Sequence, residues 1–280
     1  MIRVLGIVFL WLIWPLAAFG QENRASHCIA LAQSAPGINF VHPADYREPL
    51  PDFTVRLSYV AHSMFLLQTP GGVSAVTDYA GYLMAPDFVP DIVTMNHAHV
   101  SHWTARPDPR IANVLKGWGK LGAPAAHMLR LGDLLVRNVT TDIRRPFGEG
   151  VEKDGNSIFV FEVEGLCIGH LGHLHQEPNA AQYAALGRLD VVMAAVDGGQ
   201  TLDLPTMMRV IRRLKSAIVI PMHWWNRGSL DRFLRAMSDD FDVVDEGARY
   251  VEFSLATLPR RPTIQVLQPY FANGLDDPDN

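Results

Sequence analysis

The sequence predicts an α/β (α+β) fold in which a β-rich first half is followed by alternating helices and strands. The composition, with 48% hydrophobic and 19% charged residues in a chain of 280, is that of a globular protein with a large core. Short apolar runs typical of strands dominate from residue 53 to residue 169. Helical spacing of apolar residues begins only at residue 180, where it alternates with further apolar strands.

Residues 1–20 have the composition of a secretory signal peptide. Arg3 provides a short positive region, an apolar stretch follows, and Ala18 and Gly20 are small residues of the kind that a signal peptidase recognises. The alternative is an uncleaved membrane anchor, but the apolar stretch is shorter than the ~20 residues that a transmembrane helix needs. We therefore predict cleavage after Gly20 and a periplasmic or secreted protein without stable insertion in the membrane.

The mature chain is expected to form one domain at 53–267, with a lead-in at 21–52 and a tail at 268–280. Cys28 and Cys167 are the only cysteines, which allows one disulfide in an oxidising compartment, although a buried thiol at Cys167 is the simpler interpretation. Removing Arg3 leaves 23 basic residues (24 − 1) against 29 acidic residues. The resulting net charge of −6 argues against nucleic acid as a partner.

The expected strands of the first half are short and end at turn residues. Val55, Leu57 and Tyr59 alternate with polar residues, the pattern of a half-buried strand. Further strands are expected at 64–67, at 73–77 after a Pro-Gly-Gly turn, and at 92–95, 134–139, 157–163 and 166–169. A helical turn is expected at 111–115, inside a connection rich in proline, glycine and tryptophan.

The last third has the helical period. Helices are expected at 180–186, 204–214 and 230–237, and the second has Pro205 in its first turn and apolar residues at helical spacing behind it. Apolar strands are expected at 191–196 and 217–220, and strands at 250–255 and 263–267 close the sheet.

Seven of the eleven histidines lie in three short segments, and each segment directly follows a predicted strand. They are His97, His99 and His102, then His170, His173 and His175, and finally His223. Strand ends on one rim of a sheet converge in space. Because neutral imidazole is a good ligand for Zn²⁺, Fe or Mn, we expect a metal site built from several strands.

Five ordered landmarks resemble the metallo-β-lactamase superfamily. They are residues 59–66 (YVAHSMFL), Thr77-Asp78, H-x-H-x-S-H at 97–102, His170-Leu171-Gly172-His173 and Ile220-Pro221-Met222-His223. The nearest branch is the one that contains L-ascorbate-6-phosphate lactonase and N-acylphosphatidylethanolamine phospholipase D. The resemblance implies a four-layer αββα sandwich with one or two metal ions at one edge, usually Zn²⁺, and hydrolysis by a metal-bound hydroxide.

Carried over to this chain, the resemblance makes His97 and His99 ligands of a first metal, and His102 and His223 ligands of a second. The superfamily usually has Asp where this chain has Ser101 and His173. It also has a further histidine in the loop where this chain has Thr-Thr-Asp-Ile-Arg at 140–144. These departures remove two negative charges from a site that holds up to four positive ones, so a standard dinuclear centre is disfavoured.

Three ligand sets remain open. His102, His173 and His223 could form a three-imidazole site with an open position, Asp142 could complete a site with His97 and His99, or one ion could be shared among these groups. His170 or His175 could donate a proton to the leaving group. His62 is interpreted as a buried histidine that hydrogen-bonds groups behind the ligands, and Asp78 either orients a ligand imidazole or caps a turn.

The function predicted from these residues is that of an exported metal-dependent hydrolase. Its small-molecule substrate would be an ester, a lactone, an amide or a phosphodiester, cleaved by a metal-activated water. One alternative is a catalytically silent relative that binds metal or a ligand, because Ser101 and His173 replace the usual acidic residues. A metal-centred oxidoreductase is a third interpretation that a carboxylate-poor site allows.

Overall fold

The structure is a computed structural model that describes residues 26–30, 47–97, 99–120, 123–145 and 150–271. The predicted signal peptide, most of the lead-in and the end of the predicted tail lie outside the described residues. Within this part of the chain, no helix is long and apolar enough to cross a membrane.

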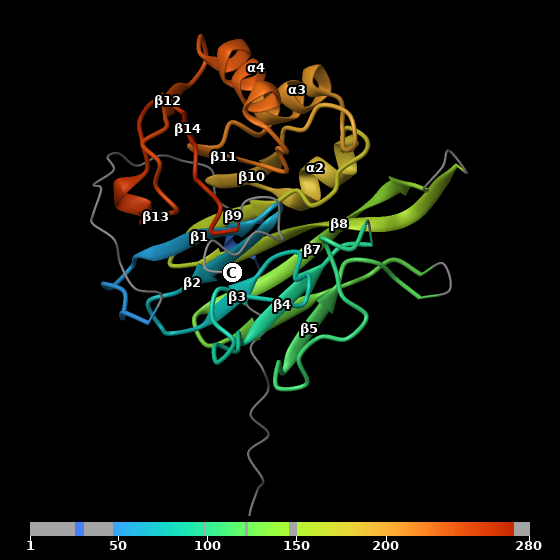
Figure 1. Cartoon of the computed structure of the whole chain (residues 1–280), viewed down its shortest axis with the longest axis vertical. Coiled ribbons are helices and arrows are strands. Elements are labelled where there is room, and N and C mark those ends of the chain that lie inside the picture. Colours follow the sequence, from blue (N-terminus) through green and yellow to red (C-terminus); the bar gives the residue numbers. More distant parts are fainter. Residues whose placement is uncertain (1–25, 31–46, 98, 121–122, 146–149, 272–280) are drawn as a thin grey trace, which may run out of the picture.

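A six-stranded and an eight-stranded sheet pack face to face, and the two longest helices, α3 (Leu204–Leu214) and α4 (Arg227–Met237), lie on the outer side of the eight-stranded sheet (Figure 1). The six-stranded sheet has the order β13 (Tyr250–Phe253), β1 (Val55–Ala61), β2 (Met64–Gln68), β3 (Ser74–Val76), β4 (Ile92–Met95) and β5 (Asn113–Lys116). The eight-stranded sheet has the order β12 (Asp242–Val244), β14 (Thr263–Gln265), β11 (Ile218–Met222), β10 (Val191–Ala195), β9 (Leu166–His170), β8 (Val151–Val163), β7 (Leu134–Arg144) and β6 (Met128–Leu131). The other helices are α1 (His27–Ala30), α2 (Ala180–Leu186) and a short 3₁₀ turn (Leu255–Thr257).

Both faces of the six-stranded sheet are buried. Tyr59 and Phe65 face the core between the sheets, whereas Val60 and Leu66 belong to a separate apolar cluster on the outer face. The segment at 55–61 is therefore buried throughout rather than half-buried as predicted. The outer cluster is completed by loop side chains such as Tyr79 and contains no residue of a described helix. The predicted two-sheet α/β fold is confirmed, but loops rather than helices cover this outer face.

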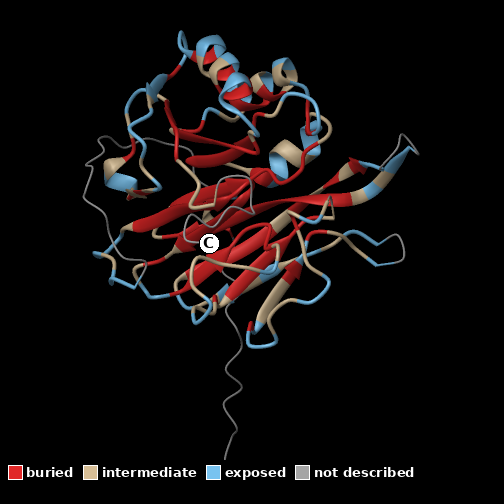
Figure 2. Ribbon diagram, viewed as in Figure 1, coloured by how far each residue is buried: buried red, intermediate tan, exposed pale blue. Residues whose placement is uncertain are grey.

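Helices α3 and α4 cover the eight-stranded sheet with one apolar side each. Val210 and Ile211 of α3 and Phe233 of α4 are fully buried in the main core, while the opposite sides are exposed (Figure 2). The predicted bounds of α2 and α3 are confirmed. Helix α4 begins three residues before its predicted start, because the Asn226 side chain accepts a hydrogen bond from the Gly228 amide and caps it there.

The wrong and missing predictions concern edge strands. Residues 113–116, expected in a helical turn, form β5, which pairs in parallel with β4 at the edge of its sheet. Strands β6 and β12 were not predicted, and both lie at edges of the larger sheet with mostly exposed side chains. An edge strand that faces water lacks the apolar pattern from which strands are predicted.

A parallel core brings the functional loops together. Strands β9, β10 and β11 are parallel neighbours in the larger sheet, and β3, β4 and β5 are parallel in the smaller one. The loops that follow β9, β10 and β11 therefore emerge at one edge, as predicted from the histidine spacing. The loop after β4 meets them there, since Asn96 at its start accepts a hydrogen bond from the Ser157 amide of β8 (2.8 Å).

A disulfide between Cys28 and Cys167 fastens α1 to β9. We call residues 26–30 the N-terminal strap, and three further contacts hold it in place. They are Ser26 Oγ to Glu162 (2.5 Å), His27 to Glu162 (3.4 Å) and the Arg188 amide to the Cys28 carbonyl (3.0 Å). The interpretation of Cys167 as a free buried thiol is therefore wrong. The sequence does not show that Cys28 and Cys167 lie close together, because the spacing of cysteines along the chain does not reveal which of them pair.

Candidate metal centre

Four imidazoles meet at the edge where the loops converge. His62, His99, His102 and His223 each place a ring nitrogen so that the four atoms lie within 4.8 Å of one another. His62 comes from the turn between β1 and β2, the next two from the loop after β4, and His223 from the residue after β11. We call this group the histidine quartet. Three of its four members are buried, and His99 is half-buried.

Carboxylates lie on the far side of two of the rings. Nδ1 of His102 is 2.5 Å from Asp78, and Nδ1 of His223 is 3.5 Å from Asp197. A carboxylate favours a proton on the nitrogen that faces it, which leaves Nε2 with a free lone pair. The two Nε2 atoms lie only 3.2 Å apart. If neither Nε2 carries a proton, the two lone pairs face each other at this distance, and a cation between them would satisfy both.

The spacing of these atoms fits one metal ion. Two imidazole nitrogens bound to a tetrahedral zinc at ~2.0–2.1 Å each lie about 3.3 Å apart. The observed 3.2 Å between the Nε2 atoms of His102 and His223 is close to that value. Nε2 of His62 and Nε2 of His99 are buried without a hydrogen-bond partner in the described part of the chain. Such nitrogens are costly unless a ligand satisfies them.

His173 adds a fifth imidazole beside the quartet. Its ring centre lies 4.7 Å from that of His102 and 5.0 Å from those of His99 and His223. Both of its nitrogens are buried and have no partner within the described residues. Its amide donates to the Asn156 side chain (2.9 Å), which fixes the loop after β9. The preceding Gly172 has a φ of +61°, and a side chain there would collide with Asn96 and Asn156.

Asp78 belongs to a buried network that links the two sheets. It is fully buried, it faces His102, and it accepts a hydrogen bond from the Asn96 amide group (2.8 Å). Ser63 Oγ also contacts His102 Nδ1 (3.0 Å). His62, Asp78 and His223 all have positive φ values, which non-glycine residues rarely adopt outside constrained sites. The fold thus holds three residues of the centre in a costly backbone conformation.

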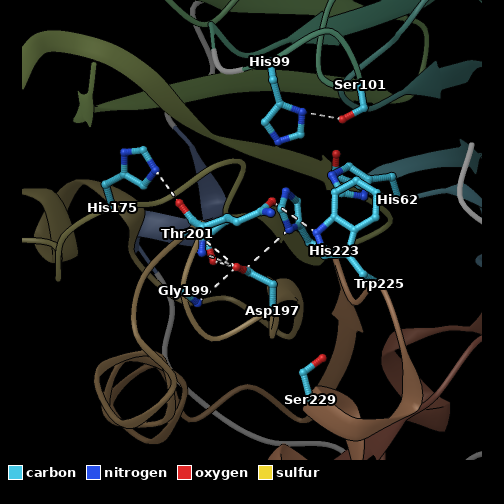
Figure 3. Close-up of polar contacts among 12 residues, drawn as sticks. His62, His99, Ser101, His175, Asp197, Gly199, Thr201, His223, Trp225 and Ser229 are labelled. Carbon is cyan, nitrogen blue, oxygen red and sulfur yellow. Dashed lines mark hydrogen bonds and ion pairs between the residues drawn. The ribbon is translucent and has the colours of Figure 1, made fainter. Parts of the chain in front are cut away.

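The loop after β10 is wound around Asp197 (Figure 3). The Asp197 carboxylate accepts hydrogen bonds from the amides of residues 199, 200 and 201 and from the Thr201 hydroxyl. From the opposite side, the Arg144 guanidinium donates to the carbonyls of the same three residues, at 3.3, 3.0 and 2.7 Å. Arg144 therefore positions Asp197, which in turn faces His223.

Replacing Arg144 by Gln is expected to loosen this loop and to lower the free energy of unfolding by about 1–2 kcal/mol, the loss of exposed charge-assisted hydrogen bonds. Hydrogen exchange of the amides at 199–201 should become faster. Metal affinity should fall by a smaller factor than in Asp197→Asn, where loss of the partner of a ligand costs about 10- to 100-fold. Arg145→Gln is the matched control, and an equal effect of the two arginine variants would contradict this role.

The charges of the centre suit a cation. Burial lowers the pKa of His62, His99, His102 and His173, so these imidazoles stay neutral and keep their lone pairs at neutral pH. Burial alone would raise the pKa of Asp197, but the neighbouring His223 and the hydrogen bonds from Thr201 lower it below its usual range. Burial raises the pKa of Asp78, and a cation at the quartet would favour the ionised form of this carboxyl.

Several residues predicted for the site lie outside the quartet. His97 faces Glu152 (Nδ1 to Oε1, 3.2 Å) and stacks on Trp118, so its ring points away from His102. Asp142 pairs with Lys153 (2.9 Å), and His170 is buried with Nε2 on the Ser63 carbonyl (2.8 Å). The role of His170 as a proton donor stays a prediction. The ligand assignments among His99, His102, His173 and His223 stay predictions, although the structure brings these four together.

Two residues of the centre were underestimated from the sequence. His62 was interpreted as a residue behind the ligands, yet its ring lies 3.9 Å from that of His223, and its backbone carbonyl accepts a hydrogen bond from the His223 amide (2.8 Å). Asp197 is not among the site residues predicted from the sequence. His62 joins β1 to β2, and Asp197 follows β10. Their positions at strand ends, on the edge where the histidine loops meet, were the sequence feature that could have indicated a role at the site. Ser101, which stands where the superfamily has Asp, contacts Nδ1 of His99 (2.8 Å) and orients that ring.

The fold and the quartet together define an α/β sandwich protein with a metal-compatible histidine centre at one edge. A sequence profile described as the Beta-lactamase superfamily domain matches residues 56–223, more than half of the chain. The chain therefore belongs to the beta-lactamase superfamily. The fold class and the superfamily predicted from the sequence are both confirmed by this match.

Relatives and solved structures agree with this assignment. The chain is 22% identical to a UPF0173 metal-dependent hydrolase of Methanosphaerula palustris over 230 residues, which are 76% of this chain and 100% of the relative. It is also 22% identical to a UPF0173 metal-dependent hydrolase of Thermoplasma volcanium, over 61% of this chain and 83% of the relative. A metallo-beta-lactamase superfamily structure from Thermotoga maritima matches 76% of this chain and 100% of its own, with 24% identity and a TM-score of 0.55. A metallo hydrolase from Ignicoccus hospitalis matches 72% and 99%, with 17% identity and a TM-score of 0.51.

Proposed function

We propose that the protein is a metal-dependent hydrolase whose histidine quartet holds the metal, with His173 beside it. The observation that carries this proposal is the pair of Nε2 atoms of His102 and His223, which face each other at 3.2 Å with a carboxylate behind each ring. The names of the two UPF0173 relatives support the same class of activity. The bonds to be cleaved are those of an ester, a lactone, an amide or a phosphodiester.

The donor set and its surrounding charges favour one zinc ion. Imidazole ligands suit Zn²⁺ and Fe better than Mn²⁺ or Mg²⁺, which prefer oxygen ligands. In the described residues, the carboxylates that contact the quartet are Asp78 and Asp197, which together balance one divalent ion. When bound, the metal would act as a Lewis acid that activates water and polarises the scissile carbonyl or phosphoryl group.

The residues of this chain would prepare the site for that chemistry. Asp78 and Asp197 orient His102 and His223 and make them better ligands. Ser101 holds the ring of His99. A cavity of about 780 Å³ next to His99 and His173 gives a substrate access to the metal-facing side of the rings. The aliphatic side chains of Ile143 and Val151 in its wall would limit water around a bound substrate.

We also propose that the protein acts outside the reducing interior of the cell. The composition of residues 1–20 supports export, and the disulfide between Cys28 and Cys167 supports it independently. Disulfides form and persist in the periplasm and in secreted proteins, whereas reducing compartments keep thiols free. The strap that this disulfide fastens would form only after transfer to an oxidising compartment.

The test of the hydrolase proposal uses full-length protein purified without a histidine tag. We expect about one zinc per chain by elemental analysis, and hydrolysis of at least one member of a panel of esters, lactones, amides and phosphodiesters. A chelator should remove both the metal and the activity, and added Zn²⁺ should restore both. Stoichiometric metal without any turnover would favour the catalytically silent alternative. Iron with a visible absorption band would favour the oxidoreductase alternative.

A further inference from the structure

Two cavities border the histidine centre. The first, which we call the hairpin pocket, is lined by His99, His173 and the ends of β7 and β8, and has a volume of about 780 Å³. The second, which we call the tryptophan pocket, is lined by His62, Trp224 and Trp225, and has a volume of about 400 Å³. His99 lines the first cavity and His62 the second, so the quartet contributes a side chain to the wall of each.

A hydrogen bond links the walls of the two pockets next to the histidine quartet. Trp225 Nε1 donates to Gln200 Oε1 at 3.1 Å, and Gln200 lines the hairpin pocket while Trp225 lines the tryptophan pocket. The Trp225 ring lies 4.5 Å from that of His62 and 6.0 Å from that of His223 (Figure 3). Both bridging side chains are exposed, so a bound molecule can displace them. A ligand that reaches both pockets would pass directly beside the quartet.

The hairpin pocket has a cationic wall. Arg144 and Arg145, at the end of β7, have no acidic partner among the described residues, and the described acceptors of the Arg144 guanidinium are the carbonyls of residues 199–201. Glu152, the acidic side chain in the lining, is already paired with His97. Within the described part of the chain, the guanidinium of Arg145 therefore has no partner and can bind a ligand. A planar guanidinium binds carboxylate and phosphate groups with paired hydrogen bonds.

The tryptophan pocket is suited to a flat, apolar group. Its wall combines Trp224, Trp225, Tyr59 and Pro269, and the Tyr59 hydroxyl is already bonded to the His62 carbonyl (2.5 Å). Trp224 Nε1 is buried without a partner in the described part of the chain, so it can donate to an acceptor on a ligand. Arg249 also reaches this pocket, but its guanidinium lies over the Tyr270 ring at 5.1 Å.

We propose that the substrate of the hydrolase has two parts. A carboxylate or phosphate group binds Arg145 in the hairpin pocket, an aromatic or similarly flat apolar group binds against Trp225 in the tryptophan pocket, and the bond to be cleaved lies between them at the quartet. This inference rests on the proposed hydrolytic function for the position of the cleaved bond. The assignment of the anionic group to one pocket and the apolar group to the other rests only on the side chains that line each pocket.

The test measures binding, without turnover, by calorimetry on the metal-loaded protein. The probes are phenylalkyl carboxylates of increasing length, the matching phenylalkyl phosphonates, alkyl carboxylates without the ring, and phenylalkyl alcohols without the charge. We expect one chain length to bind better than either one-part probe. The carboxylate and phosphonate series show which anion the pocket prefers.

Two variants assign the parts to their pockets. Arg145→Gln should weaken the two-part probe by about tenfold or more and leave the alcohol unchanged. Trp225→Ala should weaken the alcohol and the two-part probe but not the alkyl carboxylate. Lys153→Gln, which removes a cation of the same hairpin that pairs with Asp142, is the matched control and should change nothing.

Three results would overturn the inference. One is an Arg145→Gln protein with unchanged affinity for the anionic probes. Another is a loss of that affinity in Arg249→Gln instead, which would put the anion in the tryptophan pocket. The third is that the alkyl carboxylate and the phenylalkyl alcohol bind independently of each other, while no two-part probe of any chain length binds more tightly than either of them. Because the readout is binding, a protein that hydrolyses nothing but passes this test would contradict the proposed function and not the division of the ligand.

Discussion

Replacing His102 by Ala should remove the metal from the protein and make it markedly less stable. His102 is fully buried, contributes one of the two opposed Nε2 atoms, and is the imidazole partner of Asp78. Without it, a buried carboxylate loses its partner, which costs about 3–5 kcal/mol. A loss of that size lowers the melting temperature of a domain this large by roughly 10 °C. Elemental analysis and thermal melts measure both effects.

A second variant keeps this prediction testable if His102→Ala does not fold. Asp78→Asn preserves the shape and the contact with Asn96 but removes the charge that orients His102. It should fold, retain the quartet and bind zinc about 10- to 100-fold more weakly. His127→Ala, which alters a histidine bonded to the Lys116 carbonyl, is the control. Full metal content in the His102 variant would show that the centre lies elsewhere.

Reduction of the Cys28–Cys167 disulfide should cost roughly 2–4 kcal/mol of stability, because the bond links residues separated by 139 positions. The expected fall in melting temperature is about 5–15 °C. Loss of the bond also frees the strap that covers the buried Glu162 and Arg137 pair. Melts with and without a reductant measure the effect. The Cys28→Ser, Cys167→Ser double variant should start from the lower value and no longer respond to the reductant.

The same bond provides a test of location. Thiol labelling of protein from cells that express the chain with or without residues 1–20 should show blocked cysteines only when those residues are present. Blocked cysteines in both cases would separate disulfide formation from export. Free thiols in both, with equal melting temperatures in reductant, would contradict the role of the strap.

The sequence predicted the interior of the fold better than its edges. Strand β4 and helix α3 were predicted to the residue, because a buried apolar run and a helical period with Pro205 in its first turn leave little choice. Strand β5 was predicted as a helical turn, because only Leu115 among its residues is buried. The outer face of the smaller sheet was expected to carry helices, but aromatic loop residues bury it equally well.

For the site, the sequence predicted which segments meet but not which rings turn inward. The H-x-H spacing placed His97 and His99 together on one side, as in an extended strand, but the chain is irregular there. Glu152 and Trp118, distant in sequence, then hold His97 away from the quartet. His62 takes a place in the quartet because the turn after β1 is tied to the end of β11. Such contacts between distant segments are not visible in residue spacing.

The quartet is assembled from both halves of the sandwich. His62, His99 and His102 come from connections of the six-stranded sheet, whereas His223 and the adjacent His173 follow strands of the eight-stranded sheet. An ion held by these rings would link the two sheets. The free energy of metal binding would therefore add to the free energy of unfolding of the whole protein. Neither half on its own carries the whole quartet. Metal uptake during refolding would therefore report the docking of the two halves and not the formation of either one.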